Sequence, residues 1–489
     1  MKTQYETVIG LEVHSQLLTK SKMFCQCGAD YQKAPPNSRV CPICMGMPGV
    51  LPVVNKNAVR LIIRTGLSLG CKISETTKFD RKNYSYPDLM KGYQISQFDL
   101  PVAYNGIIEI TEENKQTKQI GITRVHLEED VAKLIHKSNG SKHSLVDINR
   151  AGVPLMEIVS EPDMRSPEEA NIYLNNLHAI VRSIKSSTAN MEEGSFRCDA
   201  NISIRVKGDT KLGTKVEIKN VNSFRSVFKA LKFEERRQIR CIETGEPIIQ
   251  ETRGWSDENG QTFSQRIKEY AADYRYFPEP DIPPILISRK WVEEIRSEIP
   301  ELPKEKITRY MEQFKLSQYD SQLLVSNYEI SILFEQALIS CVKLKLSVTN
   351  VAKRVANLLI VELPRLIHEF DIADNHFKSG PTELAQLILL IETGKLSTTM
   401  AKTVFEKMFV SGKTPDDVFN ASEIAQINDE KSLGKIITQV INKNPGAVAD
   451  YKNGKDTAIK FLIGQIMKIS KGTANPKMAS ELLVDQLNK

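Results

Sequence analysis

The feature that most constrains the fold is a change in the spacing of apolar residues near position 288. Before it, apolar and polar residues alternate through several segments, such as 7–17 and 195–205. This period of two is typical of strands with one buried face. Beyond Ser288 the spacing follows the helical period of 3.6 to the end of the sequence. Prolines mark the transition, at positions 278, 280, 283 and 284. The sequence therefore predicts an α+β body followed by helices.

The first predicted strand carries reactive groups on its polar face. In segment 7–17 the apolar residues alternate with Gly10, Glu12 and His14. The alternation places a carboxylate beside an imidazole, and the glycine leaves room for a ligand. An ordinary half-exposed strand also commonly carries Glu and His on its polar side. The functional interpretation therefore depends on the later strands.

Later strands present more groups of the same kind. Their polar residues are Arg124, His126, Glu128 and Asp130 in segment 119–130, Glu157 and Glu161 in segment 155–161, and Arg197, Asp199, Asn201 and Ser203 in segment 195–205. An unpaired carboxylate is costly to bury on an apolar strand, and a cation removes that cost. Several acids with an imidazole suit a hard cation such as Mg²⁺, with phosphate oxygens completing its shell.

Four clustered cysteines predict a zinc site. Cys25 and Cys27 are followed, after thirteen residues, by Cys41 and Cys44. Two close pairs can direct four thiolates at one tetrahedral ion, and four protein ligands leave no open position. The predicted zinc in loop 25–44 is therefore structural. The remaining cysteines are scattered, as expected of buried thiols in a reducing cytosol, at positions 71, 198, 241 and 341.

A short segment, 77–88, combines cations with aromatic residues. Phosphate is bound by cations and a nucleobase by flat rings, so Lys78, Arg81 and Lys82 are candidate nucleotide-binding residues, together with Arg197. A surface loop would have a similar composition. The pattern G-x-x-x-x-G-K-[ST] does not occur, so any ATP site here is built without a P-loop.

The end of the chain is basic. Residues 431–489 hold ten lysines and four acids, an excess of six that equals the formal net charge of the whole chain, +6. A basic module on a neutral body suggests a polyanionic partner, although solvated helix surfaces are also rich in lysine. No apolar run is long enough to span a bilayer, and residues 1–6 lead directly into a strand. We therefore expect no signal peptide, no membrane contact and a cytoplasmic location.

Several long motifs resemble the B subunit of the tRNA-dependent amidotransferases. They occur in order over essentially the whole chain, at 10–14, 77–88, 93–97, 126–130, 157–163, 191–201, 273–281 and 461–476. The resemblance implies an ATP-dependent carbon–nitrogen ligase that uses glutamine as amido donor. It also implies a heterotrimer with an amidase (A) partner and a small (C) partner. Such enzymes convert Glu-tRNA(Gln) to Gln-tRNA(Gln), Asp-tRNA(Asn) to Asn-tRNA(Asn), or both.

The resemblance further implies how the chemistry is divided. The B subunit uses Mg-ATP to phosphorylate the side-chain carboxylate of the misacylated amino acid, and ammonia released by the amidase displaces the phosphate. By analogy the magnesium ligands are His14, Glu128 and Glu157, with Glu12 adjacent in the catalytic site. Glu129 is an alternative ligand, but alternation favours Glu128. The implied domains are a cradle-like, kinase-like catalytic domain (1–290), a helical domain (291–411) and a helical, tRNA-binding tail (412–489).

Two other classes fit parts of the sequence. A metal-dependent hydrolase or nuclease acting on RNA would also use carboxylates and a histidine to activate water. A non-catalytic tRNA-binding subunit would need only the basic tail. A nuclease would not need ATP, so ATP dependence separates it from an amidotransferase. A non-catalytic subunit would keep transamidation when Glu128 is replaced. The sequence does not show which misacylated tRNA is the substrate.

Overall fold

The computed structural model describes residues 4–112, 116–136, 143–267, 274–370, 379–421, 430–452, 457–470, 474 and 476–487. The chain divides into two compact units, Met1–Pro303 and Lys304–Lys489. The first contains the strands and the second is helical, as the change of period predicted. An α+β body followed by helices is therefore confirmed. No helix in the described ranges is long and apolar enough to cross a bilayer.

The first unit is built on a mixed sheet that has nine strands within the described residues, in the order β14-β13-β12-β11-β1-β10-β7-β6-β2. All neighbours are antiparallel except β12 and β13. The central strand is the one with which the chain begins, flanked by strands from far along the sequence. The bounds are β1 Tyr5–Gln16, β2 Lys72–Ile73, β6 Ala103–Thr111, β7 Thr117–Glu129, β10 Pro154–Ser160, β11 Phe196–Val206, β12 Val216–Lys219, β13 Glu251–Ser256 and β14 Gln261–Ile267.

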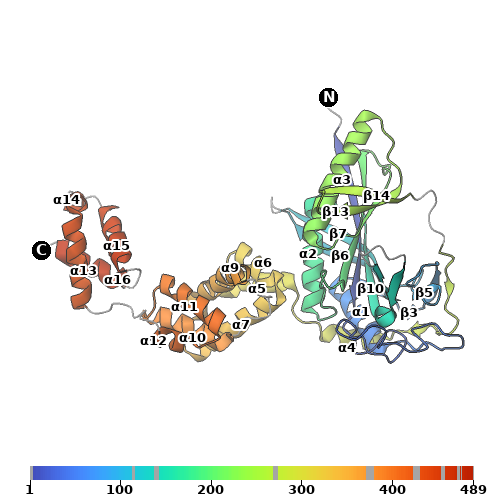
Figure 1. Ribbon diagram of the computed structural model, residues 1–489, viewed down its shortest axis with the longest axis horizontal. Coiled ribbons are helices and arrows are strands. Elements are labelled where there is room, and N and C mark those ends of the chain that lie inside the picture. Colours follow the sequence, from blue (N-terminus) through green and yellow to red (C-terminus); the bar gives the residue numbers. More distant parts are fainter. Residues whose placement is uncertain are drawn as a thin grey trace. The chain divides into compact units, whose positions relative to one another are not determined.

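Helices cover one face of this sheet, and Figure 1 shows α2 and α3 along it. These are α1 Lys56–Ser68, α2 Pro167–Ser183 and α3 Phe224–Thr244. Each of these helices starts at a capping residue, since the side chains of Asn55, Ser166 and Ser223 accept backbone N–H groups of the first turns. The core lies between helices and sheet and includes Ile9 and Val13, both fully buried. The opposite face of β1 is therefore free to carry polar groups.

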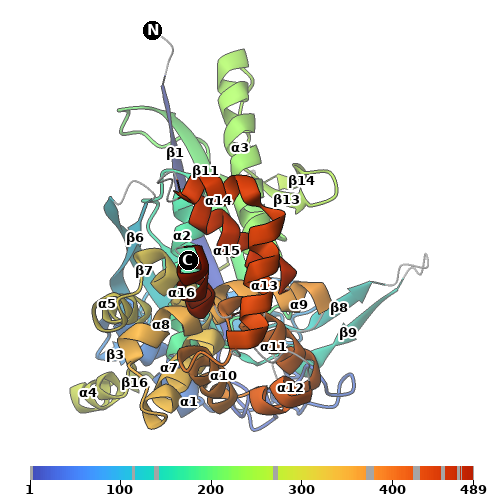
Figure 2. The same cartoon turned by 90° about the vertical axis from the view of Figure 1, so that its left-hand side faces the viewer.

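Short strands extend the first unit beside the main sheet. The segment with cations and aromatics forms β4 Asp80–Asn83, which lies between β15 Phe277–Pro278 and β5 Tyr93–Ser96. It is thus part of a small sheet rather than a free loop. The strand β3 Thr76–Thr77 pairs with β16 Ile285–Leu286. Figure 2 shows β8 Lys133–His136 and β9 Ser144–Asp147 as a two-stranded ribbon, followed by the 3₁₀ turn η1 Ile148–Arg150.

The second unit contains two hydrophobic cores, one formed by residues between 307 and 419 and one by residues between 433 and 487. Figure 1 shows α13–α16 gathered into a bundle around the second. The helices are α5 Pro303–Phe314, α6 Gln318–Ser326, α7 Tyr328–Lys343, α8 Val348–Asn357, the π-helical turn η2 Leu358–Glu362, α9 Leu363–Phe370, α10 Pro381–Glu392, α11 Thr398–Ser411, α12 Pro415–Ala421, α13 Glu430–Lys443, α14 Pro445–Lys452, α15 Thr457–Ile469 and α16 Pro476–Leu487.

The packing places two elements across the predicted domain boundaries. Helix α4 Arg289–Ser297 packs against α1, and its buried Ile295 belongs to the core of the first unit. Helix α12 follows the predicted boundary at Gly412, yet its Val418 is buried in the core of the helical domain. The core of the first unit thus includes a residue beyond 290, and the second core a residue beyond 411. The three-domain description, with its boundaries, remains a prediction.

Candidate functional site

Antiparallel pairing aligns four polar residues in one row across the middle of the sheet. His14 on β1 lies opposite Arg197 on β11 and opposite Glu157 on β10. Glu157 in turn lies opposite His126 on β7. Directly opposed residues point to the same face with Cβ atoms roughly 4.5–5.5 Å apart. The row therefore brings His14 together with groups that lie more than a hundred residues later in the sequence, on the face that α2 and α3 do not cover.

Three members of the predicted ligand set form a compact cluster on this face. His14 Nε2 lies 3.6 Å from Glu128 Oε1 and 3.5 Å from Glu157 Oε2. One ligand atom from each residue lies within 4.8 Å of the others. The carboxylates are buried, with 2% and 7% of their residue surfaces exposed. In the described part of the chain, only histidine nitrogens reach them at ion-pair distance. Two such acids fit a bound divalent cation, because burial without a countercharge is costly.

Charge pairing between the acids and the histidines shifts the pKa values of His14 and Glu157. Burial lowers the pKa of His14, but the carboxylates of Glu157 and Glu128 outweigh this and raise it to about 9. Burial raises the pKa of Glu157, but His126 and His14 hold it well below its usual range. The same field that favours a proton on His14 would favour a metal ion in its place.

The carboxylates of Glu128 and Glu129 have different partners. Glu129 forms an ion pair with Lys91, and its Oε1 accepts the backbone N–H of Ile95 at 3.0 Å. Glu128 faces His14 and accepts a hydrogen bond from Ser96 Oγ at 3.3 Å. The two acids point to opposite sides of β7, as alternation requires. This supports Glu128 as the ligand.

The motif at 93–97 acts as a support for this end of β7. Gln94 Nε2 donates to the backbone carbonyl of Glu129 at 2.7 Å, and Gln97 Oε1 accepts the backbone N–H of Leu127 at 2.9 Å. With the Ser96 hydrogen bond, three polar side chains in and beside β5 hold the segment that carries Glu128.

Lys82 is a predicted nucleotide-binding cation whose charge interacts with the carboxylates of the cluster. Burial lowers the pKa of Lys82, but the charges of Glu128 and Glu157 outweigh it and raise the pKa overall. Its Nζ lies 5.0 Å from the ring centre of Tyr274, and Tyr276 stacks on Phe98 with centroids 4.3 Å apart. A cation beside an aromatic group therefore adjoins the carboxylates. Arg197 joins the row but donates to Asp130 Oδ2 at 3.0 Å.

The other predicted cofactor-binding cations already have partners within the protein. Lys78 Nζ lies 2.5 Å from Asp80 Oδ1 and 2.6 Å from Asp99 Oδ1. Arg81 binds both oxygens of Glu279, with its Nε 2.7 Å from Oε2, and joins β4 to the segment that follows β15. These ion pairs neutralise both charges, so the structure gives them a clear structural role and offers no support for phosphate binding by either.

Glu12 lies one row away from the cluster. Its Oε1 accepts a hydrogen bond from Asn201 Nδ2 at 2.9 Å, and it lies opposite Asp199 on β11. Lys219 Nζ donates to Asp199 Oδ2 at 2.8 Å. Glu12 thus shares the polar face with His14, as the alternation predicted, but it is not a member of the described cluster. Its only link to the ligand set is that it lies two residues before His14 on the same strand.

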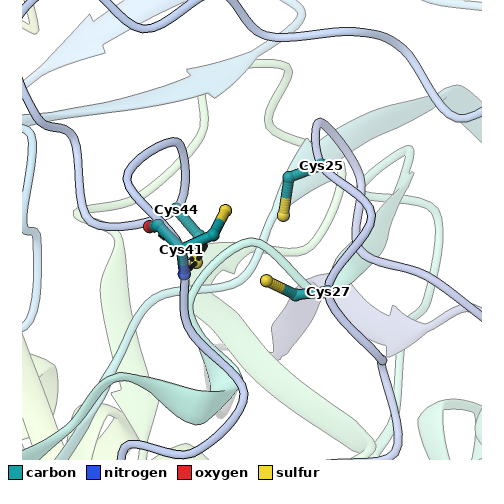
Figure 3. A group of neighbouring side chains, drawn as sticks. All are labelled: Cys25, Cys27, Cys41 and Cys44. Carbon is teal, nitrogen blue, oxygen red and sulfur yellow. Dashed lines mark hydrogen bonds between the residues drawn. The ribbon is translucent and has the colours of Figure 1, made fainter.

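The four predicted zinc ligands converge in space. Figure 3 shows the side chains of Cys25, Cys27, Cys41 and Cys44 directed toward one another, and one sulfur of each lies within 4.8 Å of the others. The Sγ atoms of Cys41 and Cys44 are 4.0 Å apart. Zinc–sulfur bonds of about 2.3 Å in a tetrahedron place sulfurs about 3.8 Å apart. The loop therefore has the donor set and the dimensions of a structural zinc site.

Lys22 places a positive charge beside the sulfur of Cys44. The residue is fully buried, and its Nζ lies 3.5 Å from Cys44 Sγ and 2.7 Å from the carbonyl of Arg39. The hydrogen bond from Cys25, together with Lys22, lowers the pKa of the Cys44 thiol. A buried ammonium group needs an anionic partner. Four thiolates around one Zn²⁺ would carry the negative charge that Lys22 offsets.

His126 is the member of the site that the predicted ligand set does not include. Its Nε2 lies 3.2 Å from Glu157 Oε2, and its buried Nδ1 has no hydrogen-bond partner among the described residues. Alternation along β7 placed it on the correct face, but only the pairing register shows that it touches Glu157. A group in contact with a ligand orients that ligand.

We therefore expect His126→Ala to weaken Mg²⁺ binding by about 10-fold to 100-fold, the usual cost of losing a group that orients a ligand. Titration of the protein with Mn²⁺, followed by electron paramagnetic resonance, measures this affinity. Replacing His143, which lies outside the cluster, with alanine serves as the control. Unchanged affinity in His126→Ala would show that Glu157 is held in place without it.

The described lysines of the tail lie on its surface. Lys435, Lys443, Lys452, Lys460 and Lys468 are exposed on α13–α15. The predicted phosphate-approaching run 470–476 lies outside the described residues except for positions 470, 474 and 476, as do Lys455, Lys471 and Lys489. Exposed lysines are expected both on a surface that binds a polyanion and on one that is only solvated.

Comparison with known proteins assigns this fold and site to a class. Residues 7–293 match the model of the GatB/GatE catalytic domain, and residues 342–487 match that of the GatB domain. The sequence is 52% identical to the aspartyl/glutamyl-tRNA(Asn/Gln) amidotransferase B subunit of Dehalococcoides mccartyi (strain CBDB1), over 100% of both chains. It is 50% identical to that of Thermodesulfovibrio yellowstonii, over 98% of both chains, and 48% identical to that of Brevibacillus brevis, over 99% of both.

The chain thus belongs to the GatB family, the family of the aspartyl/glutamyl-tRNA(Asn/Gln) amidotransferase B subunit. It is accordingly one subunit of a tRNA-dependent amidotransferase, a glutamine-dependent ligase. The resemblance of the sequence motifs to this family is confirmed. The cluster of His14, Glu128 and Glu157 lies within the residues matched to the catalytic domain.

Proposed function

We propose that this chain is the activating subunit of a heterotrimer with an amidase (A) partner and a small (C) partner. It would use Mg-ATP to phosphorylate the side-chain carboxylate of Glu-tRNA(Gln), Asp-tRNA(Asn) or both. The observation that carries the proposal is the cluster of His14 with the buried Glu128 and Glu157, on the face of the sheet opposite α2 and α3. Aminoacyl-tRNA and ATP as substrates place the reaction in the cytoplasm.

The proposed reaction has two steps that balance. An oxygen of the side-chain carboxylate attacks the γ-phosphorus of ATP, and ADP leaves with the electrons of the broken P–O bond. Ammonia from the amidase partner then attacks the activated carbon, a proton is released, and phosphate leaves with the oxygen that attacked. A carboxylate is a poor acyl donor until phosphate supplies the leaving group. Activation is mainly a matter of positioning and of neutralising charge.

The residues of the site have distinct parts in this scheme. His14, Glu128 and Glu157 would hold Mg²⁺, which supplies positive charge to the phosphate oxygens. Lys82, whose ammonium group adjoins the two carboxylates, would add a second positive charge for the phosphoryl group. Cys25, Cys27, Cys41 and Cys44 would hold Zn²⁺ and stabilise their loop without taking part in chemistry. His126 would orient Glu157.

The test is reconstitution of the complex. We expect the chain, co-expressed with the amidase and the small partner of the same source, to form glutaminyl- or asparaginyl-tRNA in a reaction that needs both ATP and glutamine. Assaying Glu-tRNA(Gln) and Asp-tRNA(Asn) separately identifies the substrate. Amide formation that proceeds without ATP would contradict the proposal, and cleavage of the tRNA instead would favour a metal-dependent nuclease.

The tail is proposed to contribute tRNA affinity rather than chemistry. Replacing three exposed lysines with alanine, at positions 435, 460 and 468, is expected to weaken tRNA binding. It should also reduce the slope of log K against log salt by about one for each phosphate that is no longer neutralised. The control replaces three exposed lysines of the helical domain, at positions 343, 395 and 407. Equal affinities and slopes in both variants would show that the tail lysines are only solvated.

A further inference from the structure

A line of basic residues runs along the outer side of α3, and the proposed function does not use it. Its members, which we call the α3 stripe, are Arg225, Lys229, Lys232, Arg236 and Arg240. All are exposed except Lys232, which is half-buried. At about 100° and 1.5 Å per residue, the stripe occupies an arc of about 80° and a length of about 22 Å. Figure 2 shows α3 at the periphery of the first unit.

Within the described residues, four of these five cations have no acidic partner in an ion pair. The exception is Lys232, whose Nζ lies 3.2 Å from Glu168 Oε1 on α2. Most described arginines of the first unit are paired, as Arg60, Arg165 and Arg205 are. Like charges three or four residues apart destabilise a helix. The α3 stripe therefore costs stability unless an anion lies against it.

The acids near the α3 stripe do not neutralise it. On α2, which packs against α3, the exposed acid is Glu168, and the other fully exposed position, Asn175, is neutral. Asp257 lies near the first turn of α3, where its Oδ2 accepts a hydrogen bond from Ser226 Oγ at 2.8 Å. Glu243 follows the stripe in the last turn. The cations outnumber these acids, so the surface keeps a net positive charge.

The α3 stripe fits the backbone of a nucleic acid. Three of its members are arginines, whose planar guanidinium group can bind phosphate oxygens through two parallel hydrogen bonds. One strand of a duplex carries a phosphate about every 3.4 Å along the axis, so the length of the stripe corresponds to about six phosphates. Because the chain belongs to a tRNA-dependent amidotransferase, tRNA is the nucleic acid that its complex encounters.

The position of the α3 stripe separates it from the reaction. Helix α3 packs against β11 and covers the face of the sheet opposite His14, Glu128 and Glu157. A tRNA with its aminoacyl end at the cluster would approach the other face.

We propose that the α3 stripe binds the sugar–phosphate backbone of a second tRNA, one that is not reacting. A tRNA held there would raise the local concentration of substrate. The inference goes beyond the proposed function and depends only on the charge pattern of α3 and on the family of the chain.

The test counts the tRNA molecules bound by the assembled complex, by sedimentation with fluorescently labelled, deacylated tRNA. At about 50 mM salt we expect two classes of site, and the Kd of the weaker class should rise about a hundredfold at about 200 mM salt, as four phosphate contacts predict. In a variant with Arg225→Gln, Lys229→Gln, Arg236→Gln and Arg240→Gln, the Kd of the weaker class should rise at least about tenfold. The KM for aminoacyl-tRNA should not change.

A matched control removes the same charge elsewhere on the first unit, by replacing the exposed Lys20, Lys33, Lys72 and Lys290 with glutamine. It should leave both classes of site unchanged. The α3 variant should fold, because glutamine is a good helix former and the substitutions remove repulsion between like charges. Its melting temperature should therefore equal or exceed that of the unaltered complex.

Several results would overturn the proposal. A single class of tRNA site in the unaltered complex at low salt would show that no second tRNA is bound. A raised KM for aminoacyl-tRNA in the α3 variant would assign the stripe to the reacting tRNA. Equal losses in the α3 variant and the control would mean that only net charge matters. A second class seen in the isolated chain but not in the complex would show that a protein partner covers α3. Failure to form amide with both tRNA sites intact would contradict only the proposed function.

Discussion

Replacing Glu128 with glutamine is expected to abolish ATP-dependent activation of the aminoacyl end of tRNA, with a loss of at least about a thousandfold. Glutamine keeps the size of the side chain and its hydrogen bond from Ser96 but removes the charge that would hold Mg²⁺. A bound metal contributes several kcal/mol of charge stabilisation in phosphoryl transfer. The measurement is formation of the phosphorylated aminoacyl end with glutamine withheld, beside a titration of tRNA binding.

The control for this variant is Glu161→Gln, which changes an exposed acid just beyond the end of β10. It should leave activation intact. In Glu128→Gln the affinity for tRNA and the glutaminase activity of the amidase partner should also persist, because the lost charge acts only on the phosphates. Activation at the normal rate would place the metal elsewhere. Loss of tRNA binding together with activation would make Glu128 a structural residue.

The second large effect concerns the cysteine cluster. Cys44→Ala is expected to release zinc and to destabilise the 25–44 loop, since structural zinc contributes about 10–16 kcal/mol of apparent binding free energy that is coupled to folding. Elemental analysis of the unaltered protein should find about one zinc per chain, and the variant should contain almost none. Limited proteolysis should then cut within the loop, which includes little of the core.

Cys341→Ala is the matched control, because this buried cysteine belongs to the core of the helical domain. It should keep its zinc and resist cleavage in the loop. Protein purified under reducing conditions without chelator, and found free of zinc, would contradict the assignment. Full loss of activity in Cys44→Ala with the loop still protected would indicate a role in chemistry that the four-ligand site does not predict.

Much of the site follows from local sequence patterns. The period of two along β1, β7 and β11 assigned each polar residue to a face, and it favoured Glu128 over Glu129. Both assignments agree with the geometry. Two close cysteine pairs sufficed to predict the thiol cluster. Such patterns depend on neighbours in sequence, so they are readable without tertiary structure.

Other features depend on pairings between distant segments and were not predictable. The register of β10 against β7 decides that His126 touches Glu157. The partners of Arg81 and Lys78 come from separate strands and loops, and they convert two candidate phosphate ligands into internal ion pairs. In each case the contacts of a side chain depend on the tertiary structure.

The central claim, activation through an acyl phosphate, is tested most directly with oxygen-18 in the side-chain carboxylate of the misacylated tRNA. In the proposed reaction the attacking oxygen becomes part of the phosphate that ammonia displaces. Mass spectrometry of the inorganic phosphate from the assembled complex, with ATP and glutamine present, measures this transfer. We predict one oxygen-18 atom in each phosphate released per amide formed, and no labelled phosphate from the Glu128→Gln complex. Unlabelled phosphate from an active complex would contradict the account.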